Sequence, residues 1–223
     1  MKYFKHKYPQ NIWANQIAKE IKPLLKEVSD DSSIVDAPCG NGIIASLVNR
    51  AIQERKFLAL DINPDLLLSP YCKKEVQTPD FQIHDIYSQL TDGDDNIWLF
   101  INSMYCLSDI EKLLSIQKPS FKFIVAVFPD IEADNYKYFL STNPDFENPS
   151  AMNLDNTVKF MQTHGFNLIK RIGNTKIKFH IWNHKFIFKR MPNTLRNILY
   201  TCIDKLLFFK QPQYTLMIFK RYE

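Results

Sequence analysis

Short runs of apolar residues alternate along the chain with longer segments whose apolar side chains recur every three or four positions. The first pattern predicts strands buried on both faces, and the second predicts amphipathic helices packed against them. The runs that fit strands are 33–37, 57–61, 81–84, 97–101, 121–128, 166–172 and 214–219. Helices are expected near 12–28, 43–51, 110–116 and 154–164. This alternation predicts a doubly wound α/β fold with a mostly parallel seven-stranded sheet.

The region before the final strand departs from this pattern. Residues 176–190 alternate polar and apolar side chains like a β-hairpin, and a helix is expected at 194–209. We therefore predict one domain, 1–223, with an insertion near its end. Its parts are an N-terminal helical segment (1–30), a core (31–175), a basic aromatic cap (176–211) and a last strand (212–223).

Charge is distributed unevenly along the chain. The formal net charge is +4, yet residues 168–223 hold 12 Lys and Arg against two acidic residues. Such a region fits an anionic substrate, an anionic membrane surface or nucleic acid, and it also fits an ordinary solvated face.

Neither the cysteines nor the N-terminus carries a metal-binding or targeting signal. The four cysteines lack Cys-x-x-Cys spacing, so we predict no metal site and a reducing compartment. The N-terminus has no apolar signal core, and apolar runs such as 123–128 are too short to cross a bilayer. We expect a cytoplasmic protein without a transmembrane segment, with peripheral membrane contact through 194–209 as an alternative.

Polar residues stand where four of the predicted strands end. They are Asp36, Asp61, Asp85 and Asn102. In doubly wound sheets the ligand binds at this edge, near the point where the strand order reverses. Two of only five glycines, Gly40 and Gly42, lie in the turn after the first strand, where they let backbone approach a ligand closely.

This turn fits two nucleoside cofactors. Residues 40–45, Gly-Asn-Gly-Ile-Ile-Ala, match the loose G-x-G-x-x-A dinucleotide pattern, with Asp61 placed to bind ribose hydroxyls. A carboxylate at Asp36 would repel a pyrophosphate, however. S-adenosylmethionine carries an ammonium group, a sulfonium and a ribose but no phosphate, so the acids favour it over NAD.

Three stretches resemble the class I S-adenosylmethionine-dependent methyltransferases: 35–42, 58–67 and 81–86. The second, Leu-Ala-Leu-Asp-Ile-Asn-Pro-Asp-Leu-Leu, is especially similar to the family's pattern of an apolar strand, an acid, then Asn-Pro and two leucines. The sequence departs from the family at Pro38, which stands where the first glycine of the turn is usual.

The resemblance implies how the cofactor would be bound at its methionine and ribose ends. Asp36 and the turn that includes Pro38, Gly40 and Gly42 would hold the methionine end. Asp61 would bind the ribose hydroxyls.

It implies roles for five further residues. Ile62 and Ile86 would lie beside adenine, and Asp85 would accept a hydrogen bond from its amino group. Asn102 and Ser103 would lie under the methionine portion and face the methyl acceptor.

We expect methyl transfer to a small or medium acceptor that is anionic and methylated on oxygen, with the cap as the substrate determinant. Transfer mainly requires positioning, and a general base helps where the acceptor is a hydroxyl. The candidate bases are Tyr105, His180, His184 and Asp130. Two alternatives stay open: an RNA methyltransferase that uses the basic C-terminal region, and a non-catalytic nucleotide-binding module or NAD-type oxidoreductase.

Overall fold

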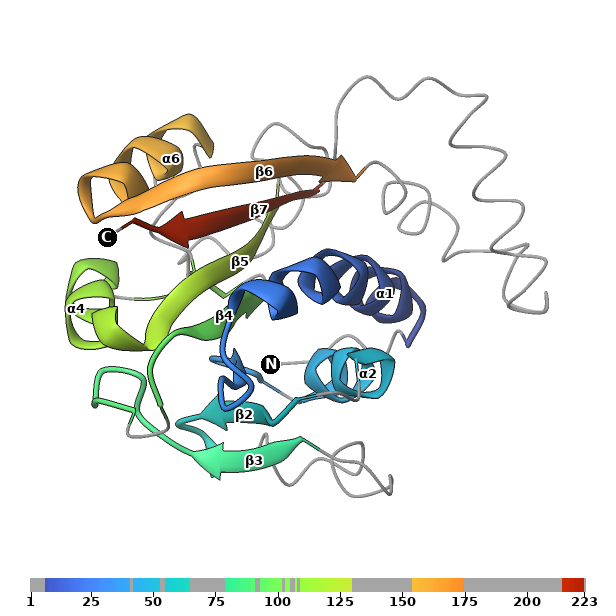
Figure 1. The fold of residues 1–223 in the computed structure, drawn as a ribbon. Coiled ribbons are helices and arrows are strands. Elements are labelled where there is room, and N and C mark those ends of the chain that lie inside the picture. The colour runs from blue at the N-terminus through green and yellow to red at the C-terminus, as the bar shows by residue number, and fades with distance from the viewer. Residues whose placement is uncertain are drawn as a thin grey trace, which may run out of the picture.

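The computed structural model shows a single sheet with helices on both faces (Figure 1). It describes residues 7–40, 42–52, 55–64, 79–90, 93–101, 103–104, 107, 109–129, 154–174 and 214–222. The strands are β1 (Ile34–Asp36), β2 (Phe57–Asp61), β3 (Asp80–Ile83), β4 (Asn96–Ile101), β5 (Phe121–Pro129), β6 (Phe166–Asn174) and β7 (Tyr214–Arg221). The described helices are α1 (Lys7–Leu24), α2 (Ile43–Ile52), α4 (Ile110–Ile116) and α6 (Leu154–Thr163), with 3₁₀ turns η1 (Leu25–Glu27) and η3 (Lys118–Ser120).

The seven strands are ordered β3-β2-β1-β4-β5-β7-β6. Strands β1 to β5 pair in parallel, and β7 runs antiparallel between β5 and β6. The predicted doubly wound, mostly parallel seven-stranded sheet is therefore confirmed. The strand order reverses between β1 and β4, which places the switch point at the end of β1.

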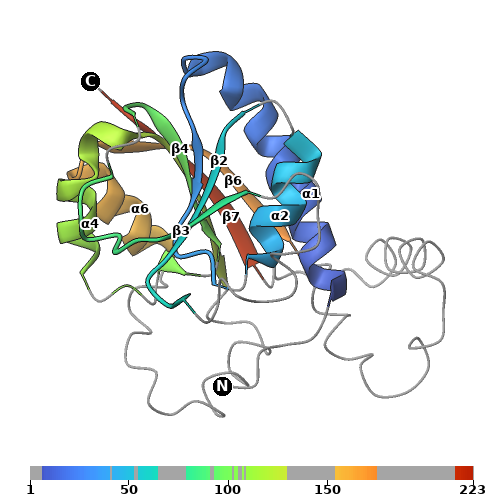
Figure 2. The ribbon, with the colours of Figure 1, turned by 90° about the horizontal axis from the view of Figure 1, so that it is seen from below.

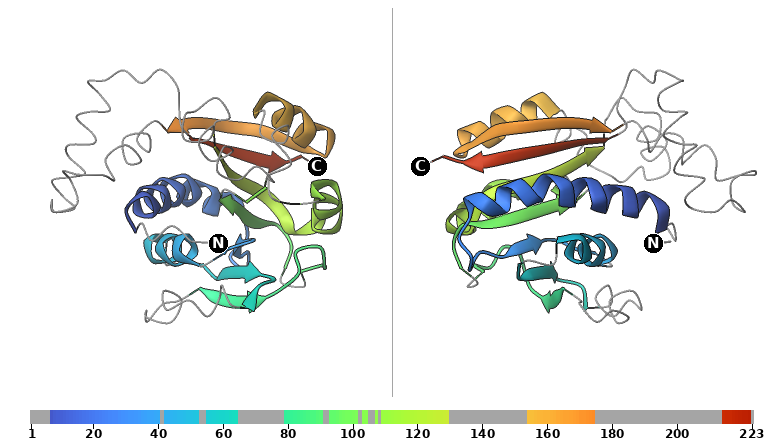
Figure 3. Two further views of the ribbon diagram at one scale, coloured as in Figure 1. Left: turned by 180° about the vertical axis from the view of Figure 1, so that it is seen from behind. Right: turned by 45° about the vertical axis from the view of Figure 1, so that its right-hand side comes forward.

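Two apolar clusters hold the helices on the sheet. Helices α1 and α2 cover one face, and α4 and α6 cover the other (Figure 2). On the first face α1 lies across the middle of the sheet (Figure 3). On the second face Trp98, Phe121 and Phe166 pack edge to face, with centroid distances of 4.9 and 5.8 Å. Both faces of the central strands are buried, which explains their continuous apolar runs.

Helix α1 differs from its predicted range of 12–28. It begins at Lys7 and ends at Leu24, with Pro23 inside its last turn and η1 directly after it. Because proline lacks an N–H and clashes with the preceding turn, the change from α to 3₁₀ geometry follows directly after it. The hairpin expected at 176–190 and the helix expected at 194–209 lie outside the described residues.

A buried asparagine joins the segments at the amino edge of the sheet. Asn96 Oδ1 accepts the N–H of Ser33 at 2.7 Å, and its Nδ2 donates to the Gly93 carbonyl and to Ser120 Oγ at 3.0 and 2.9 Å. Across the sheet, Lys170 Nζ of β6 pairs with Glu20 Oε2 of α1 at 2.6 Å. Among the described helices none is both long enough and apolar enough to cross a membrane.

Candidate functional site

The turn after β1 is bonded to both neighbouring strands. The N–H of Ala37 donates to the Leu99 carbonyl of β4 at 3.2 Å, and the N–H of Cys39 donates to the Leu60 carbonyl of β2 at 2.9 Å. The turn therefore lies in the crevice at the switch point, where ligands bind in folds of this class. The Ala37–Pro38 peptide within it is cis.

Both glycines of the turn adopt left-handed backbone conformations. The φ angle is +56° at Gly40 and +68° at Gly42. A Cβ added to Gly40 would meet no atom within 4 Å, so the backbone angle and not crowding accounts for this glycine. The Gly42 carbonyl then accepts the N–H of Ser46 at 2.9 Å as α2 begins.

Asp61 connects the turn after β1 to the turn after β2. Its Oδ2 accepts the N–H of Gly40 at 2.8 Å, and its Oδ1 accepts the N–H of Asn63 at 2.9 Å. Its backbone carbonyl accepts the N–H of His84 beyond β3 at 3.0 Å. The side chain is buried, at 4% exposed. Asp61 therefore shapes the site itself, a role that the sequence pattern did not indicate.

Asp36 is a buried carboxyl group that is incompletely hydrogen-bonded. It is 2% exposed, and its Oδ1 has no hydrogen-bond partner among the described residues. Burial, with a smaller contribution from the negative charge of Asp61, raises the pKa of Asp36 to about 8. At neutral pH the group is therefore mostly protonated, and a cation placed beside it would favour its ionised form.

Two serine hydroxyls share this property. Ser46 Oγ in α2 and Ser103 Oγ beyond β4 are buried without a hydrogen-bond partner in the described part of the chain. Buried polar atoms are usually hydrogen-bonded. Buried polar atoms that lack a described partner near the switch point therefore favour a binding site for a polar ligand there.

The residues predicted to lie beside a purine differ in exposure. Ile62 follows Asp61 and is 66% exposed, whereas Ile86 is buried in the core on the α4 side of the sheet. The Asp85 carboxylate is exposed, and its Oδ1 accepts the N–H of Tyr87 at 3.0 Å. The open apolar surface is thus at Ile62, and the open carboxylate at Asp85.

Several predicted site residues lie outside the described residues. They are Asn102, Tyr105, Asp130, His180 and His184. The described residues contain no group of three or more His, Cys, Asp or Glu that could hold a metal ion.

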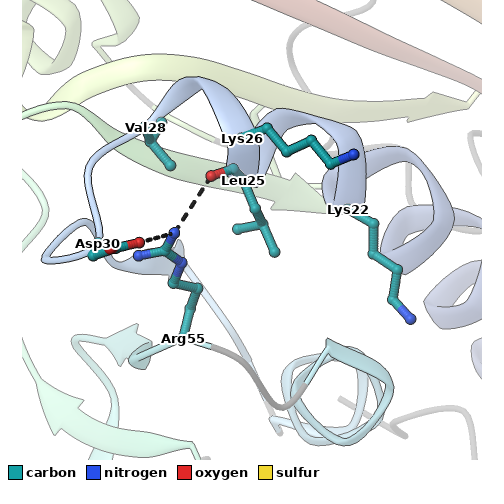
Figure 4. A pocket seen from close by; sticks show the side chains of 6 residues that line it. All are labelled: Lys22, Leu25, Lys26, Val28, Asp30 and Arg55. Atoms are coloured by element: carbon teal, nitrogen blue, oxygen red, sulfur yellow. Dashed lines mark hydrogen bonds and ion pairs between the residues drawn. The ribbon is translucent and has the colours of Figure 1, made fainter.

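A cavity of about 570 Å³ lies away from these groups, near the segments that precede β1 and β2 (Figure 4). Lys22, Leu25, Lys26, Val28, Asp30 and Arg55 line it. Arg55 pairs with Asp30 at 2.7 Å and donates to the Leu25 carbonyl at 3.4 Å. Arg55 thereby holds η1 and the segment that follows it, and none of the predicted cofactor residues lines this cavity.

Gln117, which directly follows α4, is a further residue next to the site that the sequence did not indicate. Its buried side-chain amide bonds three backbone groups of the segment 86–90, next to Asp85. A glutamine after a short helix carries no distinctive pattern, so only the three-dimensional contacts identify it.

No protein-family model matches the chain, and no curated protein sequence matches it. Solved structures do match it in fold. A SAM-dependent methyltransferase from Archaeoglobus fulgidus is 15% identical, with a TM-score of 0.61 over 93% of this chain and 94% of that chain. The methyltransferase domain of bacterial CtHen1-C is 10% identical, with a TM-score of 0.62 over 97% of this chain and 100% of that chain.

A third similar structure is that of a methyltransferase with bound SAH. The magnesium protoporphyrin IX methyltransferase ChlM from Synechocystis PCC 6803, with bound SAH, is 11% identical. Its TM-score is 0.57 over 95% of this chain and 83% of that chain. Together with the strand order, these likenesses show that the chain has the class I S-adenosylmethionine-dependent methyltransferase fold.

Proposed function

We propose that this protein binds S-adenosylmethionine at the carboxyl edge of its sheet and catalyses methyl transfer from it. The observation that carries the proposal is Asp36, a buried carboxyl group at the switch point of this fold whose Oδ1 has no hydrogen-bond partner among the described residues. A cationic ligand compensates a buried carboxylate, and the ammonium group of S-adenosylmethionine is such a cation. When bound, this cofactor supplies an electrophilic methyl group.

The methionine end would be held by the turn after β1. Asp36 would pair with the ammonium group, and the left-handed backbone around Gly40 and Gly42, together with Pro38, would shape the surface against which the ligand lies. Ser103, whose buried hydroxyl lacks a described partner, supplies a further polar group there together with Asn102.

The adenosine end would lie over β2 and β3. Asp61 would accept from the ribose hydroxyls with the lone pairs that its two backbone hydrogen bonds leave available. Ile62 offers an open apolar side chain to the base, and the exposed Asp85 carboxylate offers an acceptor to its amino group. Ile86 supports this turn from within the core.

The same arrangement disfavours an NAD-type oxidoreductase. Asp36 and Asp61 stand at the ends of two adjacent strands, β1 and β2. The segment 36–40, which leads from Asp36 to the glycine turn, contains no basic residue. A pyrophosphate there would be repelled by the Asp61 carboxylate and would further disfavour the ionised form of Asp36, whereas a cation is favoured by both groups.

We further propose an anionic acceptor that is methylated on oxygen. The cap, 176–211, holds eight Lys and Arg against one acidic residue. The residues that flank the cap, Asn174 at the end of β6 and Tyr214 at the start of β7, are opposite each other in the sheet. Tyr214 is also opposite Pro129 at the end of β5. The cap therefore leaves and re-enters the sheet at the edge that carries Asp36, which supports a role in acceptor binding.

A hydroxyl acceptor would transfer its proton to one of four candidate bases. They are Tyr105, His180, His184 and Asp130. Replacing each in turn should identify the base as the variant that loses turnover while retaining cofactor affinity.

Calorimetric titration tests the cofactor, and label transfer tests the acceptor. We expect the wild type to bind S-adenosylmethionine and S-adenosylhomocysteine but not NAD, and Asp36→Ala to lose this binding while the exposed Asp31→Ala retains it. Labelled methyl groups should then appear in an anionic fraction of a cell extract. If the wild type bound neither S-adenosylmethionine nor S-adenosylhomocysteine, the proposal would be contradicted.

RNA is a second candidate acceptor because of the basic C-terminal region. If RNA is the acceptor, its affinity should fall steeply as salt rises, since phosphate contacts release counterions. An affinity that stays constant between 50 and 200 mM salt would exclude RNA.

A further inference from the structure

The side chain of Gln117 is the main internal support of the segment that follows Asp85. It is 1% exposed and lies between α4 and β5. Its Nε2 donates to the carbonyls of Ile86, at 3.0 Å, and Ser88. Its Oε1 accepts the N–H of Leu90 at 3.1 Å. One amide thus uses both donor hydrogens and an acceptor on this single segment.

The supported segment is a turn that begins at Asp85. The Asp85 carbonyl accepts the N–H of Ser88 at 2.8 Å, and its carboxylate accepts the N–H of Tyr87 at 3.0 Å. At the other end of α4, the hydroxyl of Tyr87 accepts the N–H of Asp109 at 3.1 Å. The turn is therefore attached at both ends of α4, and Gln117 provides the buried attachment.

We propose that Gln117 is a positioning residue for base recognition, which holds the Asp85 carboxylate where a 6-aminopurine can donate a hydrogen bond to it. The inference rests on the proposed function, because it takes the ligand's base to lie beside Asp85. A carboxylate accepts from an exocyclic amine but faces an oxygen in a 6-oxopurine, so its placement determines the preference between the two bases.

Asn96 provides a matched control for a loss of structure alone. It is fully buried and, like Gln117, makes three hydrogen bonds through its amide, to Ser33, Gly93 and Ser120. It begins β4, at the edge of the sheet opposite Asp85. Loss of either amide leaves buried backbone groups unpaired, so both changes should destabilise the protein.

The experiment compares dissociation constants for S-adenosylhomocysteine and S-inosylhomocysteine. We expect the wild type to prefer the aminopurine by about tenfold or more, the value of one hydrogen bond to a charged group. Gln117→Leu should lower this preference toward that of Asp85→Ala, and should change it no further in the Asp85→Ala background. Asn96→Leu should lower the melting temperature and leave the preference unchanged.

Each other outcome is decisive. If Gln117→Leu lowers the melting temperature but keeps the wild-type preference, Gln117 is only structural and the inference is wrong. If the wild type binds both compounds equally, Asp85 does not read the base and the inference is also wrong. If the wild type binds neither, the proposed function itself fails. Should Gln117→Leu not fold, Gln117→Asn, whose amide is one methylene shorter, is measured under the same criteria.

Discussion

The carboxylate of Asp61 accepts the backbone N–H of Gly40 at 2.8 Å, and this contact joins two turns that follow neighbouring strands. One turn would hold the methionine end of the cofactor and the other the ribose. The two parts of the site are therefore one structural unit, and a change at Asp61 should affect both.

Asp61→Ala removes the acceptor for two backbone N–H groups, at Gly40 and Asn63. We expect the free energy of unfolding to fall by about 1–3 kcal/mol, because two part-buried backbone N–H groups lose a carboxylate acceptor. Affinity for S-adenosylhomocysteine should fall at least tenfold, a change of about 1.4 kcal/mol. Urea denaturation and calorimetry measure the two effects.

The control for this variant is Asp31→Ala, at an exposed aspartate. It should change neither quantity. If Asp61→Ala lost affinity without losing stability, Asp61 would act on the ligand alone and the contact with Gly40 would carry no structural role.

Asp36→Asn should change how stability depends on pH in the cofactor-free protein. The folded state raises the pKa of Asp36 from 3.8 to about 8 and so binds the proton more tightly than the unfolded chain does. The contribution of Asp36 to the free energy of unfolding therefore falls as pH rises from about 4 to about 8 and is constant above that. Asp36→Asn should lack this decline in denaturation experiments at pH 5 and 8.5; identical pH profiles would contradict it.

The same titration should appear in cofactor binding with the opposite sign. An ammonium ligand requires ionised Asp36, so affinity should rise as pH increases toward about 8. Asp36→Asn should bind the cofactor more weakly, and its affinity should lack this rise with pH. The ratio of wild-type to variant affinity cancels the cofactor's own titration, and a ratio independent of pH between 6 and 9 would show that Asp36 does not contact the cation.

Gly40→Ala places a side chain at a φ of +56°. We expect a loss of about 1–2 kcal/mol in the free energy of unfolding, because an L-residue is disfavoured in the left-handed region. Gly40→Asn should lose less, since asparagine tolerates this conformation. Gly173→Ala in β6 is the control and should be nearly neutral; equal losses in all three variants would exclude a conformational origin.

Lys170→Met should destabilise the protein more than Glu20→Gln does. The Glu20 side chain is 6% exposed and the Lys170 side chain 51% exposed. Loss of the lysine therefore leaves a buried carboxylate to which, among the described residues, Gln16 alone donates a side-chain hydrogen bond. Because solvent screens the exposed lysine, we expect the free energy of unfolding of Lys170→Met to fall by no more than about 1–2 kcal/mol. The double variant should recover part of this loss, and equal losses in both single variants would argue against a buried-charge effect.

Local patterns were sufficient to predict the seven strands of the sheet. At the edge of the sheet that carries the site, each strand ends, or in the case of β7 begins, within two residues of its predicted boundary. The reason is that strands buried on both faces leave continuous apolar runs in the sequence. The predicted range of α1, 12–28, is wrong at both ends, because its apolar periodicity continues past Pro23 into the 3₁₀ turn η1, whereas the α-helix itself ends at Leu24.

The sequence by itself determined which residues stand at the ends of β1 and β2 and in the turn between β1 and α2, because these are local properties of strand, turn and helix. Only the tertiary structure decided how they act together. The contact of Asp61 with Gly40 and the attachment of the Asp85 turn to Gln117 span 21 and about 30 residues of sequence. Such contacts follow from strand order and register, and so does the burial that sets the pKa of Asp36, since all of these depend on which distant segments are packed side by side.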